Sequence, residues 1–306
     1  MFHGVINIYK EPGFTSHDVV AKLRGILRQK KIGHTGTLDP AAEGVLPVCL
    51  GKGTKLCDLL TDKRKTYQAV LLLGTETDTQ DMTGTILSEK PTEQLTEPAV
   101  RGAAESFVGP YMQVPPMYSA LKVNGKKLYE LARAGKEVER AARPVEIYDL
   151  QIDAVELPRV TMTVTCSKGT YIRSLCADIG GKLGCGGTMQ SLVRTRVGEF
   201  RLADALTLAQ LQKLRDTDRL EEALLPTDRI FADFHAVHVE GKWRKLIDNG
   251  NAFYPGQTME QTTYPAGEWV RVYREDDSFV GIYAYDGAKE WYKPVKIFPS
   301  NTESRK

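Results

Sequence analysis

The stretch Gly33-His34-Thr35-Gly36-Thr37-Leu38-Asp39-Pro40, with Gly44 shortly after it, decides how the rest of the chain is interpreted. Glycine at every third position allows left-handed backbone conformations that other residues avoid. Pro40 fixes its own φ and favours an extended Asp39. The pattern predicts a stiff loop that presents one carboxylate beside threonine hydroxyls and an imidazole. Taken alone, Asp-Pro after glycines is more simply explained as an ordinary turn.

Size and composition indicate an ordinary globular protein. The chain has 306 residues, 42% of them hydrophobic and 26% charged, which predicts about two domains. No apolar run reaches the ~18 residues of a membrane span, and the N-terminus lacks a signal-peptide pattern. Five cysteines without CxxC pairs favour free thiols in a reducing cytoplasm, where we expect the protein to act.

The net charge is only +2, but basic residues are clustered in the first half of the chain. Five of the ten residues from Lys22 to Lys31 are basic, Lys63-Arg64-Lys65 forms a second cluster, and a third lies between Lys122 and Arg143. Any one cluster is most simply a solvated surface. Three together favour a nucleic-acid phosphate backbone as partner.

Hydrophobic patterns predict the main elements. Strands are expected over 5–10, 45–50, 67–73, 160–166 and 192–196, and helices over 16–27, 172–183 and 207–225. Thr15 or Ser16 can cap the first helix. Asn124-Gly125 predicts a hairpin turn inside a basic insertion. From about residue 229 the chain changes to short alternating segments, which predicts a small all-β domain.

Two tempting motifs fail on spacing. Gly51-Lys52-Gly53 lacks the spacing of a phosphate-binding loop, and Asp78 to Gly84 lacks that of a calcium loop and is typical of a turn. By contrast, Tyr171 and Arg173 lie where a strand is expected to end and a helix to begin, a place that favours an anion or a carboxylate. An arginine on a surface acid and a tyrosine at a core edge would fit equally well.

Together these segments resemble the TruB family of tRNA pseudouridine synthases. The loop 33–40, followed by Gly44-Val45-Leu46-Pro47, is similar to the catalytic motif of that family. Further similar segments follow in the same order: 10–18, 65–67, 115–135, and 168–175 with 192–194. Two departures are Lys10-Glu11-Pro12-Gly13, where the proline is displaced by one position, and Glu43, which we expect to be solvent-exposed.

The resemblance implies an α+β fold. It comprises a pseudouridine-synthase catalytic domain over residues 1–227, with a central mixed, largely antiparallel sheet flanked by helices. An RNA-gripping insert is implied at about 113–145, and a small β-rich PUA-like RNA-binding domain over 228–306.

The resemblance also implies roles for individual residues. Asp39 would be the nucleophile, attacking either C1′ of the ribose or C6 of the uracil. Tyr67 would stack on the flipped base, Tyr171 would lie near C5, and Arg173 would orient Asp39 and keep it ionised. The residues expected to bind RNA are His34, Lys10, Thr37, Leu192, Lys63 and Arg64.

The implied reaction converts uridine 55 in the T loop of tRNA to pseudouridine, with no cofactor and no metal. We expect a monomer that needs no protein partner and no membrane. Two alternatives remain open: a guide-RNA-dependent synthase acting on ribosomal RNA, and a tRNA-folding chaperone without catalysis.

Overall fold

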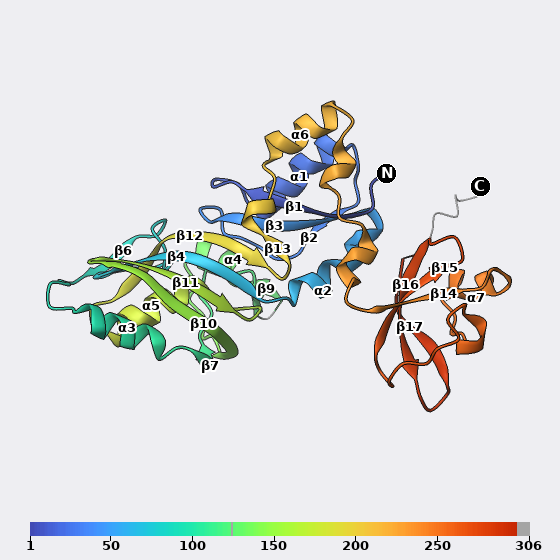
Figure 1. Cartoon of the computed structure of the whole chain (residues 1–306). Helices are drawn as coiled ribbons and strands as arrows, with labels where there is room; N and C mark the ends of the chain where they lie inside the picture. Colours follow the sequence, from blue (N-terminus) through green and yellow to red (C-terminus); the bar gives the residue numbers. More distant parts are fainter. Residues whose placement is uncertain (124, 299–306) are drawn as a thin grey trace.

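A nine-stranded sheet forms the larger part of the molecule (Figure 1). The structure is a computed structural model that describes residues 1–123 and 125–298. Within those residues the main path of the sheet is β1 (Gly4–Lys10), β3 (Glu43–Leu50), β12 (Gly187–Val197), β4 (Lys65–Leu73), β11 (Arg159–Cys166), β10 (Arg143–Glu156) and β7 (Gly109–Gln113). Short strands β2 (Ile32–His34) and β13 (Phe200–Arg201) pair with β3 and β12. Among these strands β12 and β3 run parallel and the other pairs are antiparallel, so the predicted mixed sheet is confirmed.

The β1–β3 end of the sheet is buried on both faces. Ile6, Leu46 and Val48 face a core with α1 (Ser16–Leu27) and α6 (Leu208–Asp216), while Val5 and Val45 face a second core on the other side. Successive strand residues point to opposite faces, so a strand covered on both sides must be apolar at nearly every position. That is why Val45 to Leu50 is an almost unbroken apolar run.

The other end of the sheet is covered by α3 (Glu97–Glu105) and α5 (Ile172–Lys182) (Figure 1). Ile172, Leu175, Cys176 and Ile179 recur at helical spacing on α5 and join the core formed with β4, β11 and β12. The predicted helix is thus confirmed, and its first residues are held against the middle of the sheet.

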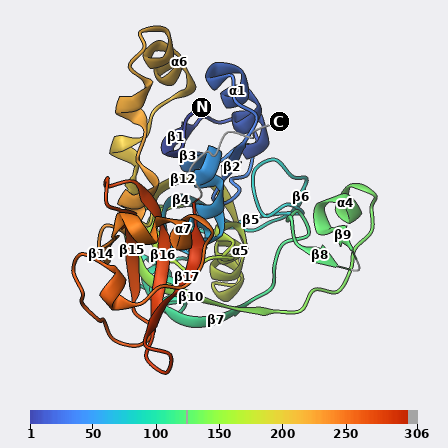
Figure 2. The same ribbon diagram turned by 90° about the vertical axis from the view of Figure 1, so that its right-hand side faces the viewer.

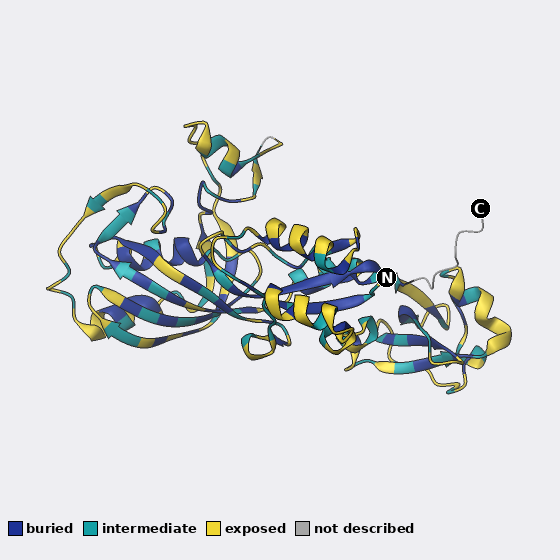
Figure 3. Ribbon diagram, turned by 90° about the horizontal axis from the view of Figure 1, so that it is seen from above, coloured by how far each residue is buried: buried dark blue, intermediate teal, exposed yellow. Residues whose placement is uncertain are grey.

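The insert projects from the body of the molecule (Figures 2 and 3). It contains β8 (Lys122–Val123), β9 (Lys126–Lys127) and α4 (Leu128–Arg133). The hairpin predicted at Asn124-Gly125 is present as a strand pair, but Asn124 lies outside the described residues. A second hairpin pairs β5 (Thr75–Thr77) with β6 (Ile86–Glu89).

A four-stranded sheet follows in the C-terminal part, in the order β14 (His235–Val239), β15 (Trp269–Arg274), β16 (Phe279–Asp286) and β17 (Trp291–Ile297). The predicted β-rich region is confirmed, although it also holds the short helix α7 (Arg244–Asp248). Phe231, Ile282 and Phe298 join the core on the far face of β1 and β3, together with residues near α2 (Cys57–Thr61). Apolar contacts therefore fasten this sheet to the first one.

Two local expectations need correction, and one open alternative is decided. The helix expected over 207–225 ends at Asp216, because Asp218 adopts a positive φ of 57° and only a short 3-10 turn follows. Gly33 lies in strand β2 and does not have a positive φ, whereas Gly36 does, at 139°. Of the two candidate caps of α1, Thr15 is the N-cap: its side chain accepts a hydrogen bond from the Asp18 amide.

Candidate active site

The loop that carries Asp39 connects β2 to β3 and is anchored at both flanks. Ser16, buried at the start of α1, accepts a hydrogen bond at Oγ from the amide of Leu38 at 2.9 Å. The carbonyl of Pro40 accepts one from the Gly13 amide, also at 2.9 Å. Asp39 itself stays open to a ligand, with 38% of its side chain exposed. The loop is therefore held by its neighbours while its carboxylate is presented.

Lys10 lies beneath this loop and is fully buried. Its ammonium group donates to the carbonyls of Glu11 and Pro40, at 3.1 Å each, and to that of Ala42. Burial lowers the pKa of Lys10 to about 8. We expected Lys10 to bind the RNA backbone, but its ammonium group is buried and donates to three backbone carbonyls. The shifted position of Pro12 therefore leaves the Lys10 side chain in contact with the Asp39 loop.

Arg194 also holds the loop. Its buried guanidinium donates to the carbonyls of Val45 at 2.7 Å and of Thr37 and Gly36 at 3.4 Å. Gly44 has a φ of 106°, and a Cβ there would lie 2.3 Å from the Arg194 carbonyl oxygen. Only glycine lets β3 approach β12 this closely. Gly44 thus allows the end of the loop to pack directly against β12 in the centre of the sheet.

Arg173 and Asp39 form a two-point ion pair across 134 residues of sequence. Arg173 Nε lies 3.0 Å from Asp39 Oδ2, and its Nη2 donates to Oδ1 at 3.3 Å. The guanidinium is buried and also donates to the carbonyls of Thr79 at 3.1 Å and Tyr118 at 2.8 Å. A planar fork of donors suits this arrangement, because it orients both carboxylate oxygens at once.

A second carboxylate, Asp81, lies behind the same guanidinium, 3.6 Å from Arg173 Nη1. Its Oδ1 accepts from the Thr79 hydroxyl at 2.8 Å and from the Thr83 amide at 3.0 Å. The segment expected to be a plain turn therefore also supports the site. Burial raises the pKa of Asp39 above its ordinary value, and the attraction of Arg173 offsets only part of that rise.

Tyr67 and Leu192 lie on the neighbouring strands β4 and β12 of the central sheet, where Tyr67 pairs with Arg194 and Leu192 pairs with Ala69. Both are buried and belong to the same apolar core as Leu38 of the loop. Burial raises the pKa of Tyr67 to about 12, so the ring is a neutral phenol at pH 7. The structure thus brings together the two residues expected to contact a base, next to the Asp39 loop.

His34 and Thr37 flank the loop differently. The His34 ring packs edge-on against His17 with centroids 5.2 Å apart, and burial lowers the pKa of His34. A neutral imidazole is suited to filling space beside a nucleotide rather than to pairing with phosphate. Thr37 is exposed, and its carbonyl is bound by Arg194.

Tyr171 is the N-cap residue of α5, two positions before Arg173. Its backbone is extended, with φ −100° and ψ 111°, and burial raises the pKa of its phenol. The side chain of Gln113 binds this backbone at both its amide and its carbonyl. The strand-to-helix junction predicted from sequence is confirmed.

The basic triplet 63–65 divides between surface and interior. Lys63 and Arg64 are exposed, and the Arg64 guanidinium lies 3.9 Å from the centre of the Tyr148 ring. Lys65 points inward and donates to the carbonyls of Thr61 and Lys63 at 2.7 and 2.8 Å. Two of the three charges are therefore available to a phosphate backbone.

Glu43 does not extend freely into solvent as expected. It is half-buried, and its Oε2 accepts a hydrogen bond from the Tyr9 hydroxyl at 2.6 Å. This bond raises the pKa of Tyr9 to about 12. The residue that departs from the family pattern thus ties the end of β1 to the start of β3.

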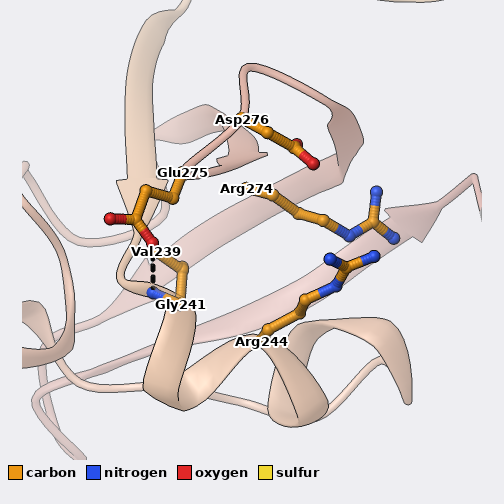
Figure 4. A pocket seen from close by; sticks show the side chains of 6 residues that line it. All are labelled: Val239, Gly241, Arg244, Arg274, Glu275 and Asp276. Atoms are coloured by element: carbon orange, nitrogen blue, oxygen red, sulfur yellow. Dashed lines mark hydrogen bonds between the residues drawn. The ribbon is translucent and has the colours of Figure 1, made fainter.

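Two surface hollows lie away from Asp39. One of about 270 Å³ is in the C-terminal part, where the side chains of Arg244 and Arg274 lie side by side (Figure 4). Arg274 is bound to Asp248, and Glu275 Oε2 accepts from the Gly241 amide at 3.0 Å. The other, of about 320 Å³, lies between α2 and the start of the second sheet. Within the described residues no group of three His, Cys, Asp or Glu side chains could hold a metal ion.

The residues not identified from sequence as part of the site are Asp81, Gln113 and Ser16, together with the supporting role of Arg194. Asp81 lies in a segment whose pattern indicates only a turn, and Gln113 lies at the edge of the predicted insert, where no site residue was expected. Only their distance to Arg173 and Tyr171 reveals them. Among the described residues, no helix has the length and apolar character needed to span a membrane.

Comparison with known proteins gives one consistent result. The model of the TruB family pseudouridylate synthase N-terminal domain matches residues 24–172, and that of the tRNA pseudouridylate synthase B C-terminal domain matches 173–232. The chain is 53% identical over 306 residues to a tRNA pseudouridine synthase B of Lachnoclostridium phytofermentans, covering 97% of this chain and 99% of the relative. It is 47% identical over 295 residues to the protein of that name from Alkaliphilus oremlandii, covering 96% and 97%.

Solved structures agree on the fold. A crystal structure of a Cbf5-Nop10-Gar1 complex contains a chain that superposes with a TM-score of 0.71 at 26% identity. The match covers 98% of this chain and 88% of that one.

Proposed function

The chain belongs to the TruB family of pseudouridylate synthases, and from this membership we propose that it converts uridine 55 in the T loop of tRNA to pseudouridine. The observation that carries the proposal is the two-point ion pair between Arg173 and the partly exposed Asp39. The loop that carries Asp39 is held by hydrogen bonds to Lys10, Ser16 and Arg194. A binding protein would not need a carboxylate held in this orientation toward an anionic ligand.

We assign Asp39 as the nucleophile, which attacks C1′ of the ribose or C6 of the uracil. In the overall reaction the N1–C1′ bond breaks, the C5–C1′ bond forms, C5 loses a proton and N1 gains one. Atoms and electrons balance without another reactant, so we propose no cofactor. Arg173 aligns the attacking oxygen and counters the rise in the pKa of Asp39 caused by burial.

The target uridine has to leave its base stack, which costs a few kcal/mol. We assign Tyr67 to stacking on the flipped base, which contributes ~1–3 kcal/mol, and Leu192 to the apolar wall beside it. His34 would occupy space next to the nucleotide. Tyr171 is assigned to the C5 side of the base, where the proton departs.

The tRNA backbone would be bound by exposed cations and the insert. We assign Lys63 and Arg64 to phosphate contacts, Thr37 to the loop edge that meets RNA, and residues 113–145 to gripping the T-stem loop. Lys10 is reassigned to positioning the loop. We further propose residues 1–227 as the catalytic domain and 228–306 as a PUA-like RNA-binding domain, acting as a monomer in the cytoplasm where tRNA matures.

The test uses an unmodified tRNA transcript with tritium at uridine C5. Wild-type protein should release tritium, and Asp39→Asn should release none while its affinity for the transcript stays within about 3-fold, because Asp39 contributes chemistry more than binding. Replacing the T-loop uridine by cytidine should abolish release and so identify the position. Binding without release by a folded wild-type protein would overturn the proposal and favour a chaperone or a guide-dependent enzyme.

A further inference from the structure

The side chain of Gln113 is buried, with 1% of its surface exposed, at the last position of β7. Its Oε1 accepts from the Tyr171 amide at 2.8 Å, and its Nε2 donates to the Tyr171 carbonyl at 3.0 Å. The side-chain amide therefore pairs with the backbone of Tyr171 much as a neighbouring strand would. As the N-cap, Tyr171 has no acceptor for its amide within α5, whereas its carbonyl also accepts from the Leu175 amide at 3.1 Å.

The remaining hydrogen of the Gln113 amide is also engaged. Nε2 donates to the Tyr111 hydroxyl at 3.0 Å, and that hydroxyl donates to Asp178 Oδ2 on α5. Each donor in this chain has one acceptor, so the amide has one satisfied orientation. Tyr171 is the N-cap of α5 and Asp178 lies further along the helix, so the network binds α5 once at its start and once beyond its middle.

Gln113 also marks the neck of the insert. It is the register partner of Arg143: the chain leaves the sheet after Gln113 and returns to it at Arg143. Just beyond the neck, the Tyr118 carbonyl accepts from Arg173 Nη2 at 2.8 Å. The first residues of the insert thus contact the backbone of Tyr171 and the guanidinium that holds Asp39.

From this geometry we infer that Gln113 is a positioning residue for the isomerisation: it holds the Tyr171 backbone, and through the start of α5 the Tyr171 phenol and Arg173, at the base of the insert. The inference rests on the proposed function, because it assumes that Tyr171 and Arg173 act in this reaction. Misplacing a group by about 1 Å can reduce a rate about 100-fold.

The test compares Gln113→Leu with wild type in single-turnover tritium release at saturating tRNA. Leucine keeps the approximate size and removes all three hydrogen bonds. The rate should fall by about 100-fold while the Kd for tRNA changes by less than about 3-fold. Gln151→Leu, at an exposed position of the adjacent strand β10, is the matched control and should keep the wild-type rate.

Gln113→Glu separates positioning from packing. The introduced carboxylate can accept from the Tyr171 amide but cannot donate to its carbonyl, whereas the protonated acid can donate. The rate relative to wild type at the same pH should therefore be lowest at high pH and should recover as the pH falls. A purely structural role predicts a ratio that does not change with pH. If Gln113→Leu does not fold, this variant decides.

A third measurement does not depend on activity. Amide hydrogen exchange at Tyr171 should be at least about 10-fold faster in Gln113→Leu, since its acceptor has been removed, and unchanged in Gln151→Leu. Wild-type rates in Gln113→Leu, or a loss of tRNA affinity as large as the loss of rate, would overturn the inference. A wild-type protein that releases no tritium would instead overturn the proposed function, and the exchange measurement would still show whether Gln113 holds Tyr171.

Discussion

Replacing Arg173 by lysine tests how much of the catalysis depends on a planar donor fork. The guanidinium contacts both oxygens of Asp39, at 3.0 and 3.3 Å, and the carbonyls of Thr79 and Tyr118. A lysine ammonium retains the charge but is a single point with a shorter reach, so it cannot make these contacts together. The carboxylate is then free to rotate.

The structure allows the effects on stability and on rate to be compared. Two buried carbonyls that lose a donor cost about 1–3 kcal/mol each, which a domain stable by about 5–15 kcal/mol can tolerate. A nucleophile displaced by about 1 Å loses about 100-fold in rate. We therefore expect Arg173→Lys to remain folded, to bind tRNA within about 3-fold of wild type, and to turn over about 100-fold more slowly.

The assay is single-turnover tritium release, combined with filter binding and thermal unfolding of the same preparations. Arg101→Lys is the matched control, because Arg101 also binds a carboxylate, that of Glu97, but on the surface of α3. It should change the rate by less than about 2-fold.

The pH profile gives a second readout. In the proposed reaction Asp39 attacks as a carboxylate, so the rate should fall as the pH drops through its pKa. Burial raises that pKa and Arg173 lowers it, so Arg173→Met should move the acidic limb to higher pH. An unchanged limb, or a loss of affinity equal to the loss of rate, would refute the assigned role of Arg173.

Two further predictions concern the loop supports. Burial lowers the pKa of Lys10 to about 8, so between about pH 8 and 10.5 the unfolded chain binds more protons at Lys10 than the folded chain does. Over this range the free energy of unfolding of wild type should therefore rise relative to that of Lys10→Met, by up to about 3 kcal/mol. Urea titration at several pH values measures the difference. A difference that is constant with pH would contradict a buried, titrating Lys10. Gly44→Ala should lower the free energy of unfolding by about 2–5 kcal/mol in the same titration, because Gly44 has a φ of 106° and a Cβ there would collide with the Arg194 backbone. Gly25→Ala is the control: Gly25 lies in α1 with open space around it, so this change should be neutral or stabilising. Equal stabilities of the two alanine variants would show that β3 can move away from β12.

Local sequence patterns were sufficient for much of the fold. The capped helix α1, strand β3 and the start of α5 follow from periodicity and capping, which depend on residues a few positions apart. The glycines and Asp39-Pro40 indicated the proposed catalytic loop for the same reason. The sequence pattern assigned the same role to Gly33, Gly36 and Gly44, yet only Gly36 and Gly44 have a positive φ. The backbone conformation at each glycine depends on the distant residues that pack against it.

Tertiary structure alone decided which side chains meet. Asp39 and Arg173 are 134 residues apart, and Asp81 and Gln113 come from segments with no distinctive local pattern. Lys10 and Lys65 are charged residues in basic surroundings, but both point inward to backbone carbonyls. Strand order and register set these contacts, and they depend on how distant apolar faces pack into shared cores. The sequence by itself therefore indicates the proposed nucleophile and its loop, while the strand order and register of the sheet determine which groups orient it.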